Sequence, residues 1–200
     1  MNPLLEEALK VDPDIISADS WRLPSSNIDA FAARRELVKR YAWAIPNDEA
    51  LNAIAEWSPI VEIGAGTGYW AYLLTLKGAD LVAYDIAPGR NRWCDANLYF
   101  PVAIGGPEKA SEHSDRTLFL CWPPYDDEMA ERALLAYRGE RLVYIGEWCG
   151  GCCANDRFFD LIETGWRLVR EVRIPQWWGL HDSVFMYERN RDARKDVPRD

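Results

Sequence analysis

The segment IVEIGAGTG, residues 60–68, is a short apolar run that leads into a loop with glycine at every second position. The apolar run predicts a buried strand, and the apolar residues over 69–77 predict a helix that ends at Gly78. Glycine permits positive φ angles and, because it has no Cβ, a close approach of the backbone to a ligand. We therefore expect a strand that turns sharply into a helix beside a binding site.

Strands and helices alternate after this segment. Strands are predicted over 60–63, 81–86, 101–104, 116–121, 141–146, 166–174 and 183–188, and helices over 69–77, 129–137 and 155–163. The stretch 87–97 is ambiguous between a loop and a short helix. This alternation is typical of an α/β fold, a doubly wound and mostly parallel sheet with helices on both faces. The last two strands have no helix between them, so they should form an antiparallel pair at one edge.

The first 57 residues are predicted to be helical. Asn2 and Pro3 indicate the start of a helix over 4–10, and Asn27 indicates the start of one over 28–40. A third helix is expected over 48–57, and a linker rich in Pro, Asp and Ser over 12–26. We divide the chain into an N-terminal helical extension or lid (1–57), a Rossmann-like domain (58–190) and a flexible tail (189–200).

Composition narrows the classes of function. The chain has 32 acidic and 23 basic residues and a formal charge of −9, which argues against a nucleic-acid partner because phosphate binding needs a basic surface. No run approaches the roughly 18 apolar residues of a membrane helix, and the first ten residues lack a signal-peptide pattern. Five cysteines in a chain of 200 residues indicate reduced thiols, and hence a cytoplasmic location.

The motif Glu62-x-Gly64-x-Gly66-x-Gly68, followed by Asp85 at the end of the next strand, resembles the first two motifs of the class I S-adenosylmethionine-dependent methyltransferases. The spacing is GxGxG rather than the GxGxxG of dinucleotide-binding proteins, and the Lys-Ser/Thr of a P-loop is missing. The resemblance covers about residues 58–190. It implies a seven-stranded sheet with an antiparallel terminal strand, and S-adenosylmethionine as the cofactor.

The resemblance also assigns cofactor-binding residues. Glu62 and the loop residues would hold the methionine part, Asp85 the ribose, and Ile86 one face of the adenine. A further expectation comes from the topology: the helix before the first strand runs from the carboxyl edge to the amino edge, so Tyr41 or Trp43, just before it, is expected to cover the methionine end. Cys121 ends the strand over 116–121. The full cofactor-binding set is Tyr41, Glu62, Gly64, Ala65, Gly66, Gly68, Asp85, Ile86 and Cys121.

A second site is expected at Trp122-Pro123-Pro124-Tyr125, after the strand over 116–121. The motif is similar to the Asp/Asn/Ser-Pro-Pro-Tyr of methyltransferases that modify exocyclic or amide nitrogens. There the first residue accepts hydrogen bonds from the amine and the aromatic residue stacks on the substrate. Trp122 departs from the pattern because an indole N–H donates and cannot accept.

Two further residues are candidates for a general base at the carboxyl edge of the sheet. Glu147 ends the strand over 141–146, and a carboxylate there is suited to proton transfer. His181 lies in the loop 175–182 together with Trp177 and Trp178. A helix-capping or salt-bridging carboxylate and a surface histidine are the alternative interpretations. The catalytic candidates are Trp122, Tyr125, Glu147 and His181.

The single CxxC at 149–152 is one pair only, whereas a structural zinc site needs four ligands, so no metal site is expected. Its double glycine is interpreted as close backbone packing beside the pocket.

Ten tryptophans in 200 residues point to an aromatic pocket. Six are expected around the mouth of the site: Trp43, Trp70, Trp122, Trp148, Trp177 and Trp178.

The resulting hypothesis is an S-adenosylmethionine-dependent methyltransferase that acts on a small molecule or protein side chain in this Trp-rich pocket. Three alternatives remain: an amine-directed methyltransferase of nucleic acid or protein, a non-catalytic S-adenosylmethionine-binding module, and an NAD-dependent oxidoreductase. The oligomeric state stays open.

Overall fold

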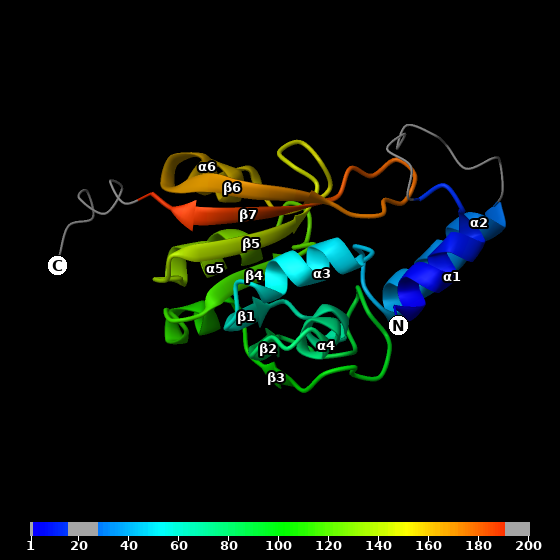
Figure 1. Cartoon of the computed structure of the whole chain (residues 1–200), viewed down its shortest axis with the longest axis horizontal. Helices are drawn as coiled ribbons and strands as arrows, with labels where there is room; N and C mark the ends of the chain where they lie inside the picture. Colours follow the sequence, from blue (N-terminus) through cyan, green and yellow to red (C-terminus); the bar gives the residue numbers. More distant parts are fainter. Residues whose placement is uncertain (1, 16–27, 191–200) are drawn as a thin grey trace.

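The computed structural model describes residues 2–15 and 28–190, so most of the expected linker and of the expected tail lies outside the described residues. The described chain contains a single mixed sheet in the order β3-β2-β1-β4-β5-β7-β6 (Figure 1). Its strands are β1 (Ile60–Ile63), β2 (Leu81–Asp85), β3 (Val102–Ile104), β4 (Thr117–Cys121), β5 (Arg141–Gly146), β6 (Trp166–Arg173) and β7 (Ser183–Arg189). The helices are α1 (Pro3–Val11), α2 (Ile28–Arg40), α3 (Asp48–Ala55), α4 (Tyr69–Leu76), α5 (Met129–Ala136), α6 (Asp156–Gly165) and the 3₁₀ helix η1 (Pro107–Glu112).

The topology confirms the predicted fold class. β1, β2, β3, β4 and β5 pair in parallel, while β7 pairs antiparallel with both β5 and β6. The antiparallel strand is the last along the chain but lies one place in from the edge, between β5 and β6. Strand order reverses between β1 and β4, which is where open α/β sheets bind ligands at the carboxyl ends of their strands.

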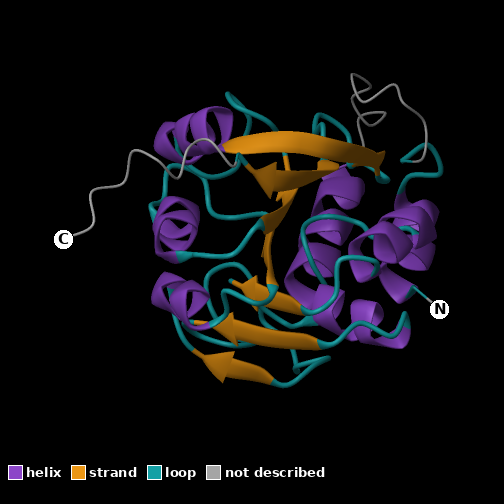
Figure 2. Ribbon diagram, turned by 60° about the vertical axis from the view of Figure 1, so that its left-hand side comes forward, coloured by secondary structure: helices purple, strands orange, loops and turns teal. Residues whose placement is uncertain are grey.

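Helices cover both faces of the sheet (Figure 2). On one face α3 and α4 pack over Phe119 and Val143, and on the other η1, α5 and α6 pack over Leu118 and Leu142. Successive residues of β4 and β5 therefore point to opposite faces, as the pleat of a strand requires. Both faces are apolar, which explains why these strands are uninterrupted apolar runs rather than alternating patterns.

Asparagine caps start three of the helices. The side chains of Asn2, Asn47 and Asn155 accept hydrogen bonds from backbone N–H groups three residues on, as expected at Ncap. α4 ends before Gly78, whose φ of +89° suits glycine. The stretch 87–97 forms turns and one isolated bridge between Arg90 and Asp95 instead of a helix, and η1 was not predicted.

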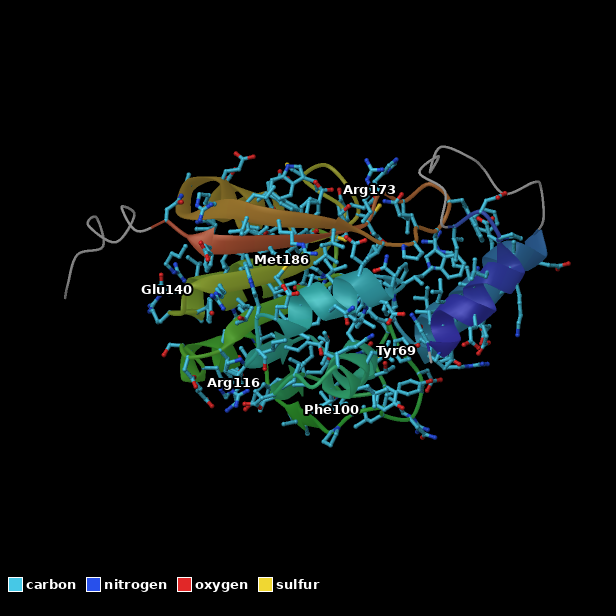
Figure 3. All side chains as sticks on the ribbon, in the orientation of Figure 1. Tyr69, Phe100, Arg116, Glu140, Arg173 and Met186 are labelled. Atoms are coloured by element: carbon cyan, nitrogen blue, oxygen red, sulfur yellow. The ribbon has the colours of Figure 1, made fainter. Side chains whose placement is uncertain are left out.

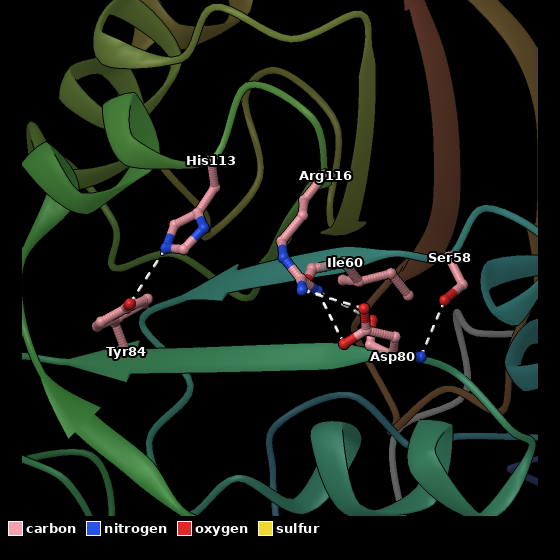
Figure 4. Close-up of polar contacts among 6 residues, drawn as sticks. All are labelled: Ser58, Ile60, Asp80, Tyr84, His113 and Arg116. Carbon is pink, nitrogen blue, oxygen red and sulfur yellow. Dashed lines mark hydrogen bonds and ion pairs between the residues drawn. The ribbon is translucent and has the colours of Figure 1, made fainter.

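At the amino edge of the parallel strands, polar contacts join residues that precede β1, β2 and β4 (Figure 4). Both guanidinium nitrogens of Arg116 donate to the Asp80 carboxylate at 3.0 Å, and the Asp80 N–H donates to Ser58 Oγ at 2.9 Å. On the η1 face, the Tyr84 hydroxyl lies 3.1 Å from His113 Nε2, so this histidine is half-buried against the sheet.

The opposite, carboxyl edge is covered by the N-terminal helices (Figure 1). Tyr69, at the start of α4, lies at this end of the molecule, whereas Arg116 and Glu140 lie at the other (Figure 3). The Tyr69 hydroxyl donates to Asn2 Oδ1 at 2.8 Å, and the Gln176 N–H donates to the carbonyl of Ile15 at 2.8 Å. The chain N-terminal to α3 is therefore bound to both α4 and the loop between β6 and β7. Among the described helices, none has the length and apolar character needed to cross a membrane.

Candidate functional site

The loop after β1 forms a tight turn in which all three glycines have positive φ: +78° at Gly64, +55° at Gly66 and +71° at Gly68. Other residues rarely adopt this conformation. A Cβ at Gly64 would lie 2.8 Å from Met129 Cε, and one at Gly68 would lie 2.9 Å from Val102. All three glycines suit the conformation, and Gly68 is also needed for the packing, since its Cβ would in addition lie 3.2 Å from the Phe100 carbonyl oxygen. The loop leads into α4, whose N-cap residue Gly68 makes no side-chain capping hydrogen bond.

Glu62 is buried within β1, with 2% of its surface exposed. Its Oε2 atom has no hydrogen-bond partner among the described residues. Desolvation, with a smaller effect of the nearby Asp85 charge, raises the pKa of Glu62 to about 8. An unpartnered buried carboxylate is costly, so this one is suited to bind a positively charged or hydrogen-bond-donating ligand.

Asp85 lies at the end of β2, next to the glycine loop. Its Oδ2 accepts from the N–H of Gly66 and its Oδ1 from the N–H of Ala87, both at 2.8 Å. Each carboxylate oxygen keeps a further lone pair, so Asp85 can still accept from a ligand hydroxyl. Ile86 follows Asp85, and 75% of its surface is exposed to solvent.

The segment before α3 covers the glycine loop. The Thr67 hydroxyl donates to the carbonyl of Tyr41 at 2.6 Å in a buried contact. The Tyr41 ring packs against Tyr69 and Tyr99, and its hydroxyl donates to Glu7 at 2.6 Å. Tyr41 therefore lies beside the glycine loop, and its hydroxyl is already bound to Glu7 of α1.

Trp122 follows β4 with a φ of +51°, a strained conformation for a residue that precedes proline. Its ring stacks on Trp43 with centroids 4.8 Å apart, and Trp93 meets Trp43 edge-on at 6.2 Å. The buried indole N–H of Trp122 has no hydrogen-bond partner among the described residues. The strain and the orphan donor make Trp122 a candidate for contact with a ligand.

Glu147 and His181, the two proposed bases, lie together. Glu147 Oε1 accepts from the His181 N–H at 3.1 Å and lies 3.4 Å from His181 Nδ1, while Oε2 accepts from the Cys152 N–H at 2.8 Å. Glu147 is 6% exposed. A Cβ at Gly151 would lie 2.4 Å from Glu147 Cβ, whereas one at Gly150 would have no atom within 4 Å, so the close packing expected of the double glycine holds for Gly151 and is wrong for Gly150.

Asp182 is the acidic residue that the sequence analysis missed. It is fully buried, and the indole N–H of Trp122 lies close enough to act on its carboxylate as a donor, although the contact falls outside full hydrogen-bond geometry. Burial raises the pKa of Asp182 to about 7, the Trp122 N–H lowers it, and the charge of Glu147 raises it. The signal available in the sequence was an acid that directly precedes a buried strand and follows His181.

Arg34 of α2 adds a positive charge at the same place. Its guanidinium lies 5.8 Å and 5.7 Å from the ring centroids of Trp177 and Trp178, and it interacts with the charges of Asp182 and Glu147. We refer to Arg34, Trp122, Glu147 and Asp182 as the Asp182 cluster.

Cys121 is the last residue of β4. Burial raises the pKa of its thiol well above the ordinary value, and it interacts with the charges of both Glu62 and Asp182. By contrast, Tyr125 leaves 66% of its surface exposed and is not packed into the buried cluster. Within the part of the chain that the structure describes, no group of His, Cys, Asp and Glu residues is arranged to hold a metal ion.

The set of tryptophans at the carboxyl edge of the sheet differs from the set predicted from the sequence. Trp70 is a core residue whose Nε1 donates to the Ala44 carbonyl at 3.3 Å, and Trp148 packs on the α6 face against Phe159. Trp93, which is not among the six tryptophans expected at the mouth of the site, packs edge-on against Trp43. The tryptophans gathered at the carboxyl edge are Trp43, Trp93, Trp122, Trp177 and Trp178.

No protein-family model and no curated protein sequence matches the chain. Among solved structures it is similar to the magnesium protoporphyrin IX methyltransferase of Synechocystis PCC 6803 with bound S-adenosylhomocysteine, at 11% identity over 93% of this chain and 98% of that one, with a TM-score of 0.48. It is also similar to the 1,6-didemethyltoxoflavin-N1-methyltransferase of Burkholderia thailandensis, at 18% identity over 84% and 93%, with a TM-score of 0.44.

Proposed function

We propose that this protein is an S-adenosylmethionine-dependent methyltransferase whose acceptor, a small molecule or a protein side chain, binds at the Trp-rich carboxyl edge of the sheet. The observation that carries the proposal is the buried, unpartnered Oε2 of Glu62 beside three glycines with positive φ and the carboxylate of Asp85. Bound S-adenosylmethionine would supply a sulfonium methyl group for transfer to a nucleophile.

The residues present fit such a cofactor. Glu62 offers an acceptor for an ammonium group, and the glycine loop allows a backbone approach that a Cβ would prevent. Asp85 retains lone pairs for the ribose hydroxyls. Cys121, at the end of β4, remains a neutral thiol and is acted on by the charges of both Glu62 and Asp182.

Three alternatives are less well supported. In an amine-directed enzyme the residue before the two prolines must accept hydrogen bonds, whereas Trp122 presents only a donor. A dinucleotide would also use an acidic residue at the end of β2, so NAD has to be compared directly in solution. A binding module without catalysis would bind S-adenosylmethionine but transfer its methyl group to no acceptor.

Isothermal titration calorimetry with S-adenosylhomocysteine and with NAD tests the proposal. We expect S-adenosylhomocysteine to bind and NAD to produce no heat at millimolar concentration. Glu62→Gln and Gly66→Ala should each weaken binding by at least about tenfold. Gly78→Ala is the matched control, because Gly78 has the same type of backbone conformation, at φ +89°, with no atom within 4 Å of an added Cβ.

The proposal would be overturned by a wild-type chain that ignores S-adenosylhomocysteine, or by Gly66→Ala behaving like Gly78→Ala. Preferential binding of NAD would favour the oxidoreductase instead. Methyl transfer is then measured with labelled S-adenosylmethionine.

A further inference from the structure

The CxxC pair Cys149 and Cys152 lies in the loop between β5 and α6, and the proposed function makes no use of it. These two are the exposed cysteines of the chain, whereas Cys94 and Cys153 are buried and Cys121 is partly buried. All five are free thiols in the structure. Two accessible thiols separated by two residues can form a reversible disulfide by thiol–disulfide exchange.

The chain reverses direction between the two cysteines. The Gly151 N–H donates to the carbonyl of Trp148 at 2.9 Å, which closes a turn with Cys149 and Gly150 at its tip. Gly150 has a φ of +89°, and a Cβ added there would meet no atom within 4 Å, so the tip faces open space. With glycine at both positions between the cysteines, the backbone has the freedom to bring the two sulfur atoms together.

Both ends of this turn are anchored. At one end Trp148 packs against Phe159 of α6, with ring centroids 5.2 Å apart. At the other end the Cys152 N–H donates to Glu147 Oε2 at 2.8 Å. Since the loop is short and held at each end, it loses little conformational entropy when the two thiols meet.

The two thiols have different roles in the exchange. Burial, the charge of Glu147 and a hydrogen bond to its carboxylate raise the pKa of the Cys152 thiol, which keeps it protonated at neutral pH. Because the thiolate is the attacking form, Cys149 at the exposed tip is the first nucleophile and Cys152 follows it. Cys153 is excluded as the partner, since it is 2% exposed and burial raises the pKa of its thiol far above the ordinary value.

We propose that this loop is a site of reversible oxidation, in which Cys149 and Cys152 form a disulfide by exchange with a small-molecule disulfide such as oxidised glutathione. The Cys149 thiolate attacks one glutathione sulfur, the S–S bond of glutathione breaks, and the released glutathione takes up the proton that Cys149 lost. Cys152 then attacks Cys149 Sγ, and its proton passes to the second departing glutathione. Two protein thiols are oxidised while one small-molecule disulfide is reduced to two thiols.

Glu147 connects the oxidised loop to the carboxyl edge of the sheet. Its carboxylate accepts from the Cys152 N–H with one oxygen and from the His181 N–H with the other. A Cβ at Gly151 would lie 2.4 Å from Glu147 Cβ, so the turn and Glu147 are in close contact. When Cys152 turns toward Cys149, its thiol leaves the carboxylate. The disulfide therefore changes the hydrogen bonding of Glu147 and, through it, the position of the segment at His181.

The mass of the full chain after treatment with excess oxidised glutathione at about pH 8 tests the pairing. We expect the wild type to lose two hydrogen atoms, to carry no glutathione and to regain its mass in dithiothreitol. Cys152→Ser should stop as a glutathione adduct on Cys149, and Cys149→Ser should form no disulfide. Cys153→Ala is the matched control and should still form the disulfide. In oxidised wild type that is unfolded and alkylated, Cys153 should carry the label, which checks the pairing without that variant.

Amide NMR spectra of the same samples test the connection to the carboxyl edge. Oxidation should shift the amide signals of Cys152 and His181 in the wild type, because both N–H groups donate to Glu147. The His181 signal should stay in place in Cys149→Ser treated in the same way. The Asp80 amide, which donates to Ser58 at the amino edge, is the internal control and should not move.

A glutathione adduct that persists on the wild type, a disulfide that survives in Cys149→Ser, or an oxidised Cys153 would overturn the assigned pair. A disulfide that forms while the His181 amide signal stays in place would overturn the connection through Glu147. These measurements use neither S-adenosylmethionine nor turnover, so their outcome is independent of the proposed function.

Discussion

The Oε1 atom of Glu147 accepts a hydrogen bond from the backbone N–H of His181 at 3.1 Å, so the end of β5 is joined to the loop between β6 and β7. Its second oxygen accepts from the N–H of Cys152, in the loop before α6. Glu147 thus uses both oxygens to hold two loops, one of which carries Asp182. This geometry supports a positioning role more directly than a role as base.

Glu147→Gln should therefore destabilise the fold. An amide offers one acceptor oxygen, so its NH₂ group would face one of the two backbone N–H donors, at a cost of about 1–3 kcal/mol in the free energy of unfolding. Urea denaturation at neutral pH measures the change. Glu163→Gln, on the exposed surface of α6, is the control and should stay within about 0.5 kcal/mol of wild type. Equal midpoints for the two variants would contradict the positioning role.

Thr67→Val should loosen the cover over the glycine loop. The substitution keeps the shape of the side chain but leaves the buried carbonyl of Tyr41 without its donor, which costs about 1–3 kcal/mol. We expect a lower free energy of unfolding and faster hydrogen exchange around residues 41–44. Thr67→Ser retains the hydroxyl and should recover most of the stability. If the Thr67→Ser and Thr67→Val variants are equally destabilised, the hydrogen bond from Thr67 does not hold residues 41–44 over the glycine loop.

Much of the fold follows from local patterns. β1 and β5 have the predicted boundaries because each is an apolar run bounded by proline, glycine or charged residues. The stretch 87–97 resisted prediction since its hydrogen bonds go to distant partners: the Gly89 N–H donates to the Gly66 carbonyl and the Asp95 N–H to the Lys39 carbonyl. Such long-range bonds leave no periodic signal in the sequence.

The candidate site was only partly predictable for the same reason. Glu62 and Asp85 were found because a motif fixes their spacing relative to the glycines. Asp182 and Arg34 come from separate parts of the chain, and their meeting depends on how α2 packs over the loop between β6 and β7. Trp70 was misplaced because position along a strand or helix does not show which way a ring turns.

Arg116→Lys should weaken the amino edge without affecting the site. Arg116 makes two parallel contacts of 3.0 Å to Asp80, which a lysine ammonium cannot reproduce. Because Asp80 is largely exposed, the expected loss is only about 0.5–1 kcal/mol, measured by thermal or urea unfolding. Arg170→Lys, in a single exposed pair with Glu56, should have no measurable effect. A change in S-adenosylhomocysteine affinity for Arg116→Lys would contradict the separation of the two edges.

Glu62 should make the protein less stable as pH rises. Burial raises its pKa in the folded state to about 8 from the ordinary value of 4.5, so the folded state binds the proton more tightly than the unfolded state. The resulting stabilisation, on the order of a few kcal/mol, is fully present below the unfolded pKa and is lost as pH rises through about 8. Asp182 contributes with the same sign, from its ordinary value of 3.8 up to about 7. The slope of the free energy of unfolding between pH 7 and 8 therefore belongs mainly to Glu62.

Glu62→Gln isolates this contribution, since the amide is neutral at every pH. We expect the variant to lose the slope between pH 7 and 8 in urea denaturation, while Asp182→Asn retains it and loses slope at lower pH. Saturating S-adenosylhomocysteine should reduce the slope in the wild type, because an ammonium group beside Glu62 favours the ionised carboxylate. A Glu62→Gln profile parallel to that of the wild type would show that Glu62 ionises normally, and the electrostatic basis of the cofactor site would have to be abandoned.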